Sequence, residues 1–126
     1  MNKESIDQLS DQIRTCGFAL HNFLKHGHNE KVYENGIANR LRKQSVTVEQ
    51  QHPIPVHDED GTLLGDFKAD LLLESELIIE LKAVKTITDD HVSQLLGYLR
   101  ATGKLYGLLI NFGSPIFFIK RYILTT

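Results

Sequence analysis

The sequence predicts one α/β domain over residues 1–126, in which a mixed β-sheet is flanked by helices in the order ααβββαββ. Three segments carry apolar residues at helical spacing, and five shorter segments read as strands bounded by turn residues. One helix separates two of the later strands, and this arrangement favours a parallel pair. A hydrophobic content of 41% in 126 residues is enough for one core.

Two helices are expected at the start of the chain. The first covers Ser5–Lys25, with Ser5 and Gln8 as a capping box. Gly27 interrupts the helical pattern, and a second helix follows over residues 29–44 with Asn29 as its cap. Its buried side carries three residues spaced four apart, Tyr33, Ile37 and Leu41.

The strands and the third helix follow. Strands are predicted over Val46–Gln51, Leu63–Leu73, Leu77–Val84, Leu105–Phe112 and Phe117–Leu124. Pro53 and Pro55 indicate a sheet edge, and residues 58–61 (Asp-Glu-Asp-Gly) indicate a turn. The third helix begins at Thr88 and ends at Gly103.

Composition limits the classes of function. The formal charge of −2 weighs slightly against a partner held by charge alone, although a bound metal can offset carboxylates in a nuclease. The single cysteine, Cys16, excludes an internal disulfide and a cysteine-based metal cluster, and we expect it in the core. Without an apolar run of membrane-spanning length or a signal-like N-terminus, the expected location is the cytoplasm, away from membranes.

Charged residues interrupt two apolar strands that look central. Asp70 lies in the strand over 63–73, and Glu80 and Lys82 share one face of the strand over 77–84. A hairpin centred near Ser75 would place Asp70 opposite Glu80, with Cβ atoms about 4.5–5.5 Å apart. Two carboxylates at that distance repel each other unless a cation lies between them. A metal site and a salt bridge from Lys82 both remain open at this point.

Three further polar residues lie on the predicted helices. Glu30 falls in the first turn of the second helix, a position that acids also favour because of the helix dipole. Gln94 and Tyr98 are four apart on one stripe of the third helix. On this apolar stripe Gln94 is either a satisfied core amide or a group that binds phosphate or water.

Five segments together resemble the GxxExxY protein family, which is assigned to the PD-(D/E)xK nuclease-like superfamily. They are residues 27–33 (GHNEKVY), 66–70 (DFKAD), 79–83 (IELKA), 94–98 (QLLGY) and 108–112 (LLINF), in the family's order and spacing. The likeness covers roughly residues 10–124. Where the family often has Gly-Pro-Gly before its glutamate, this chain has Lys25-His26-Gly27, so the loop beside the site can differ in shape.

The resemblance implies a restriction-endonuclease-like fold and a set of site residues. Asp70 would be the motif aspartate, and Glu80 and Lys82 the (D/E)xK pair. The metal, Mg²⁺ or alternatively Mn²⁺, would be bound by Asp70, Glu80, the Leu81 backbone carbonyl and Glu30. Catalysis would fall to Lys82 with Glu80 and Asp70, and substrate would be bound by Gln94, Tyr98 and Tyr33.

The function implied is hydrolysis of phosphodiester bonds in nucleic acid, with a homodimer left open. One alternative is a catalytically silent module of the same fold that binds nucleic acid or a protein. Another is a protein–protein adaptor that keeps these residues as a structural network. Intact Asp70, Glu80 and Lys82 favour the enzyme, whereas the acidic balance favours the alternatives.

Overall fold

The computed structural model describes residues 1–125 and contains three helices and five strands in these residues. Their bounds are α1 (Lys3–Leu24), α2 (Glu30–Lys43), β1 (Val48–His57), β2 (Leu63–Leu73), β3 (Leu77–Lys82), α3 (Asp89–Thr102), β4 (Tyr106–Asn111) and β5 (Phe118–Ile123). The order ααβββαββ and the mixed sheet confirm the predicted fold class.

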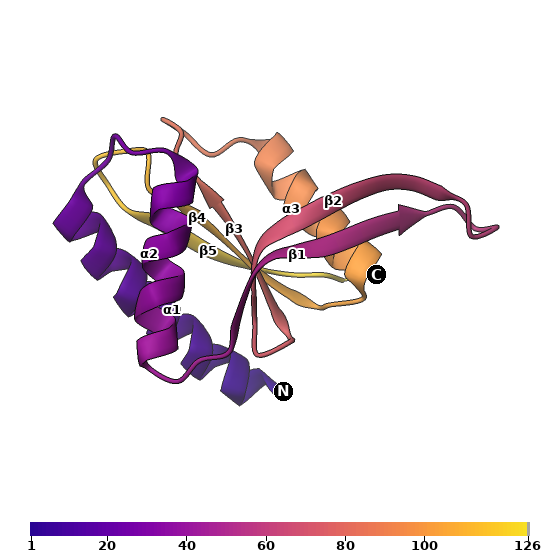
Figure 1. The fold of residues 1–126 in the computed structure, drawn as a ribbon, viewed down its shortest axis with the longest axis horizontal. Helices are drawn as coiled ribbons and strands as arrows, with labels where there is room; N and C mark the ends of the chain where they lie inside the picture. Colours follow the sequence, from indigo (N-terminus) through magenta and orange to yellow (C-terminus); the bar gives the residue numbers. More distant parts are fainter. Residues whose placement is uncertain (126) are drawn as a thin grey trace.

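The five strands form one sheet in the order β1-β2-β3-β4-β5. β3 and β4 are parallel and are joined through α3, whereas the other neighbouring pairs are antiparallel. α1 and α2 lie on one side of the sheet and α3 on the other (Figure 1). Side chains therefore alternate along β3 between two apolar layers: Leu77, Ile79 and Leu81 face α1 and α2, and Ile78 faces α3.

The N-terminal caps of two of the three helices are the ones predicted from the sequence. Asn29 caps α2 through its side chain, and Thr88 caps α3, where the His91 ring accepts from the Thr88 N–H. The predicted capping box at Ser5 is wrong, because the helix begins earlier. Asn2 is the cap, and its side-chain oxygen accepts from the Ser5 N–H at 2.8 Å. Asn is as good a cap as Ser, so a start at either position satisfied the pattern.

The outer half of the β1–β2 hairpin projects beyond the rest of the sheet (Figure 1). We call residues 53–68 the β1–β2 arm. β1 does not stop at Gln51 but continues through both prolines to His57, which an edge strand permits. β2 is buried only in its second half, whereas Leu63, Leu64 and Phe67 are exposed. The predicted central place of this strand is confirmed by its position between β1 and β3, but its first half is exposed although its residues are largely apolar.

Candidate active site

Asp70 and Glu80 lie at the point where β2 and β3 separate. The two strands pair from Leu73–Leu77 to Leu71–Ile79, so Asp70 and Glu80 are the next residues in register. This register is the one expected from a hairpin centred near Ser75. The Asp70 N–H donates to Glu80 Oε2 at 2.8 Å, and the Leu81 N–H donates to Asp70 Oδ2 at 2.8 Å. Each carboxylate thus accepts a backbone N–H just beyond the last backbone pair between β2 and β3.

Burial and mutual repulsion favour the neutral forms of both acids. Glu80 is 4% exposed, and burial together with the charge of Asp70 raises its pKa from 4.5 to about 8. Burial also raises the pKa of Asp70, and the charges of Glu34 and Glu30 add to this effect. Two acids in this state are stabilised by any cation that binds between their carboxylates.

Lys82 follows Glu80 on the same face of β3 but is bonded elsewhere. Its Nζ donates to Gln94 Oε1 on α3 at 3.0 Å. Within the part of the chain that the structure describes, Lys82 forms no ion pair with Asp70 or Glu80. The predicted salt-bridge alternative is therefore not the arrangement found. The hydrogen bond between Lys82 and Gln94 instead joins two predicted site residues, one on β3 and one on α3.

Tyr98 lies one turn after Gln94 on α3 and faces the same acids. Burial raises the pKa of its phenol, and the charges of Glu80 and Asp70 raise it further. Its ring also neighbours Phe67 on the β1–β2 arm, with centroids 6.1 Å apart. α3 thus carries an amide that binds Lys82 and a phenol whose pKa is raised by the charges of Glu80 and Asp70.

α2 contributes two acids, of which the sequence indicated only one. Glu30 is exposed in the first turn, and its charge raises the pKa of both Asp70 and Glu80. Glu34, one turn later, is 3% exposed and was missed. Its carboxylate accepts from Gln50 Nε2 at 2.7 Å and from Gln51 Nε2 at 2.6 Å. The spacing of four from Glu30 was the available signal, because such residues share a helix face.

The backbone of β1 is distorted beside the same point. Gln51 has φ of 56°, in the left-handed region, and lies between the pairs Gln50–Leu71 and His52–Ala69, opposite Asp70. Left-handed backbone in a non-glycine residue is uncommon and tends to occur where a side chain must be redirected. Here the Gln51 amide reaches α2 and binds Glu34. The distorted residue Gln51 therefore lies in one row with Asp70 and Glu80, where the pairing of β2 with β3 ends.

Tyr33, which was predicted to bind substrate, is fully buried. Its hydroxyl donates to the Lys25 carbonyl at 2.6 Å and accepts from the His28 N–H at 3.2 Å. Its ring stacks on Phe112, with centroids 4.5 Å apart. Substrate cannot reach such a side chain, so the prediction of substrate contact is wrong and the predicted place on the buried side of α2 is confirmed. Tyr33 fixes the loop that leads to Glu30.

Hydrogen bonds from Asn111 and Phe112 fix the backbone at the end of β3, where Lys82 lies. The Asn111 side chain, 2% exposed, accepts from the Val84 N–H at 3.0 Å and donates to the Val84 carbonyl at 2.8 Å. The Phe112 N–H donates to the Lys82 carbonyl at 2.9 Å. Asn111 belongs to one of the quoted segments, but its role depends on a contact across 27 residues that no local pattern reveals.

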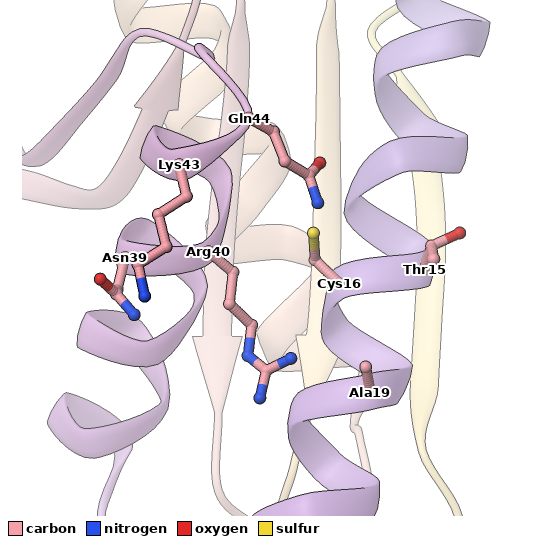
Figure 2. A pocket seen from close by; sticks show the side chains of 7 residues that line it. All are labelled: Thr15, Cys16, Ala19, Asn39, Arg40, Lys43 and Gln44. Atoms are coloured by element: carbon pink, nitrogen blue, oxygen red, sulfur yellow. The ribbon is translucent and has the colours of Figure 1, made fainter.

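Other candidate features lie apart from this site. A recess of about 440 Å³ lies between α1 and α2 and is bordered by Arg40, Lys43 and the buried Cys16 (Figure 2). It includes none of the predicted site residues. Among residues 1–125, no three His, Cys, Asp or Glu side chains already converge as a metal-ligand set, and no helix is long and apolar enough to span a membrane.

The comparisons with known proteins agree with this geometry. A model of the PD-(D/E)XK nuclease superfamily matches residues 7–122, and the chain belongs to this superfamily. Nucleases of the superfamily generally use divalent metal ions. No curated protein matches the sequence significantly.

Two solved structures are similar to this chain, and the first of them shares its fold. The crystal structure of SSO0001 is 15% identical, with a TM-score of 0.59, over 76% of this chain and 51% of that one. An alkaline exonuclease from Laribacter hongkongensis, LHK-Exo, is 14% identical, with a TM-score of 0.46, over 70% of this chain and 52% of that one. The chain spans about half the length of each.

Proposed function

We propose that this protein is a metal-dependent nuclease that hydrolyses phosphodiester bonds of nucleic acid with Mg²⁺, which Mn²⁺ can replace. The observation that carries the proposal is the pair formed by half-buried Asp70 and buried Glu80, two acids that lie in register where β2 and β3 separate. The five ordered sequence segments support a place in the GxxExxY group of the superfamily.

The donor atoms of this site fit magnesium. Mg²⁺ prefers oxygen ligands, and it is usually held by one or two carboxylates with waters and substrate phosphates completing its shell. Asp70 and Glu80 each use one oxygen for a backbone N–H, which leaves the second oxygen of each carboxylate for a cation. The Leu81 carbonyl and Glu30 are the further oxygen donors that we assign. A set of two carboxylates is enough for this ion, although no three acidic side chains in residues 1–125 are already clustered.

The residues of the chain would divide the chemistry among them. When bound, Mg²⁺ would polarise a phosphoryl oxygen and supply a more acidic water. Lys82, protonated and held by Gln94, would stabilise the negative charge that develops on the phosphoryl group. Glu30, near the mouth of the site on α2, would orient the waters around the ion. Gln94 and Tyr98 on α3 would position the scissile strand.

The test is cleavage of single-stranded, duplex and branched nucleic acids by the purified protein, with Mg²⁺, Mn²⁺ or a chelator. We expect cleavage only with metal, and none from Asp70→Asn. Equal cleavage by wild type and Asp70→Asn would assign the activity to a contaminant and overturn the proposal. Binding of nucleic acid without cleavage would favour the silent module instead.

A second readout does not depend on activity. Mg²⁺ should raise the melting temperature of the wild type, because an ion that binds only the folded state stabilises it. Asp70→Asn should abolish this increase, since it removes one of the two carboxylates. An undiminished response in the variant would place the ion elsewhere.

A further inference from the structure

The aromatic side chain of Phe67 is half exposed beside the candidate site and does not belong to either core cluster. Phe67, on β2 three residues before Asp70, is 48% exposed. Its ring lies 6.1 Å from the Tyr98 ring, centroid to centroid, with 37° between their planes. Tyr98 packs against the apolar cluster under α3, whereas Phe67 is not part of that cluster. The pair therefore spans from the core beside the carboxylates to solvent.

The backbone of β2 makes room for this ring. A Cβ added at Gly65 would lie 2.6 Å from the Phe67 ring. Because Gly65 has no side chain, the ring can rest against the strand and lean toward α3. Phe67 is thus held between Gly65 and Tyr98, with an open face.

The charges nearby disfavour a partner that is recognised through its phosphates along the arm. The β1–β2 arm carries exposed acids at its tip, residues 58–60, and at Asp66, against one cation, Lys68, and the whole chain has a formal charge of −2. Binding through phosphate contacts needs clusters of Lys and Arg. Stacking of a base on an aromatic ring needs no such charge and contributes strongly to binding of single strands.

We propose that Phe67 and Tyr98 form a stacking platform for an unpaired base next to the scissile phosphate. The site then accepts single-stranded or frayed nucleic acid in preference to intact duplex, because a duplex hides the faces of its bases within its own stack. This inference names the substrate class of the site proposed above and rests on that proposed function. Phe67 contributes the exposed ring, and Tyr98 joins the platform to Asp70 and Glu80.

The experiment measures binding apart from cleavage. All variants carry Asp70→Asn, and the probes are a short single-stranded oligonucleotide with 2-aminopurine and a blunt hairpin duplex of the same sequence, with Mg²⁺. Base stacking is read from quenching of the 2-aminopurine, and affinity from fluorescence anisotropy. A gel verifies that the probe stays intact.

We expect Phe67→Ala to weaken binding of the single strand about tenfold, the scale of one lost base–aromatic stack, with little change for the duplex. Phe67→Trp should keep or improve the affinity and the quenching. Gly65→Ala should reduce the quenching while keeping the ring, because the added methyl group displaces it. Phe18→Ala is the matched control, since Phe18 is exposed on α1, on the other side of the sheet.

Three results would overturn the platform. They are unchanged single-strand binding in Phe67→Ala, an equal loss for single strand and duplex, and the absence of single-strand binding in the parent. Thermal melts identify a variant that loses binding through unfolding. If Phe67→Ala unfolds, the affinity and quenching of Phe67→Trp decide whether the platform exists. If the parent binds and quenches the single strand but wild type cleaves nothing with any metal, the proposed nuclease activity fails and the stacking platform stands.

Discussion

Half-buried Asp70 and buried Glu80 are tolerated between β2 and β3 because each carboxylate accepts a backbone N–H of the opposite strand. These bonds satisfy two donors at the point where the strands separate, but they do not remove the repulsion between the acids. The pKa of Glu80 is raised first by burial and then by the charge of Asp70. A residue pair in this state binds a proton or a cation more readily than a solvated pair does.

The pH dependence of stability follows from Glu80. Its pKa is raised from 4.5 to about 8, so the folded state holds this proton more tightly than the unfolded state. The stabilisation is complete below about pH 4.5 and is lost as pH rises through 8. One pKa unit corresponds to about 1.4 kcal/mol, so this shift sets an upper bound of several kcal/mol.

We expect the melting temperature of the chelator-treated protein to fall by several degrees between pH 5 and pH 9. Glu80→Gln should flatten this decline and raise the melting temperature at the alkaline end, because the amide carries no charge. Thermal melts of both proteins across this pH range test it. Parallel pH profiles for wild type and variant would show that Glu80 does not cause the decline.

Lys82 can be tested separately from metal binding. Its ammonium group has no lone pair for a metal ion, so Lys82→Ala should keep or improve Mg²⁺ affinity. Cleavage should fall by a factor of about 10² or more, the scale for losing one preorganised electrostatic group. Kinetics and calorimetric titration of Mg²⁺ measure the two effects. Lys43→Ala, at the far end of α2, is the control that should change neither.

At the scale of elements, the site depends on how strands end. β2 and β3 separate at Asp70, β1 is distorted at Gln51, and the segment after β3 is tied to β4 through Asn111. α2 and α3 then bring Glu34 and Gln94 to opposite sides of this opening. Asp70 and Glu80 thus lie where the pairing of β2 with β3 ends, and regular helices carry other candidate residues of the site.

Two glycines give a matched test of this arrangement. A Cβ at Gly113 would lie 2.1 Å from the Val84 nitrogen, so Gly113→Ala must displace the backbone after Lys82. We expect a loss of stability of order 2 kcal/mol, as for overpacked sites, together with reduced cleavage. Gly97→Ala on α3 meets nothing within 4 Å and should stabilise the protein by about 0.5–1 kcal/mol. Denaturant melts of both variants measure the difference, and equal effects would contradict it.

At the scale of the whole molecule, the β1–β2 arm and the two-layered core differ in their burial. β3 and β4 are buried from Leu77 to Leu81 and from Gly107 to Asn111. The arm has one face or both in solvent over most of its length. Backbone hydrogen bonds in exposed segments open more often than those in the core.

The rates of amide hydrogen exchange should therefore differ between the buried part of the sheet and the β1–β2 arm. We expect the slowest amides in β3 and β4, close to the free energy of global unfolding, and faster exchange in residues 54–67. Native-state exchange measured by NMR tests this, with the buried half of β2, Leu71–Leu73, as the internal comparison on the same strand. Uniform protection along β2 would mean that the arm and the core open as one unit.

The sequence alone determined the order of elements and the principal acids of the site. An apolar segment bounded by turn residues predicted β2 to the residue, and Glu74 and Ser75 formed the turn that set Asp70 opposite Glu80. These features depend on local periodicity and on turn chemistry, both of which can be read within a few residues. The superfamily followed from five such segments in order.

Only the tertiary structure decided which polar side chains reach the site. Tyr33 belongs to a site motif but is buried under Phe112, and Glu34 belongs to no quoted motif but is held by Gln50 and Gln51. Tyr33 and Glu34 are neighbours on one turn of α2. The orientation of that helix against the sheet directs Tyr33 toward Phe112 and Glu34 toward β1. The exposure of Phe67 depends likewise on where the arm leaves the core. Such contacts join residues far apart in the chain, and their energies are set by packing that no local pattern contains.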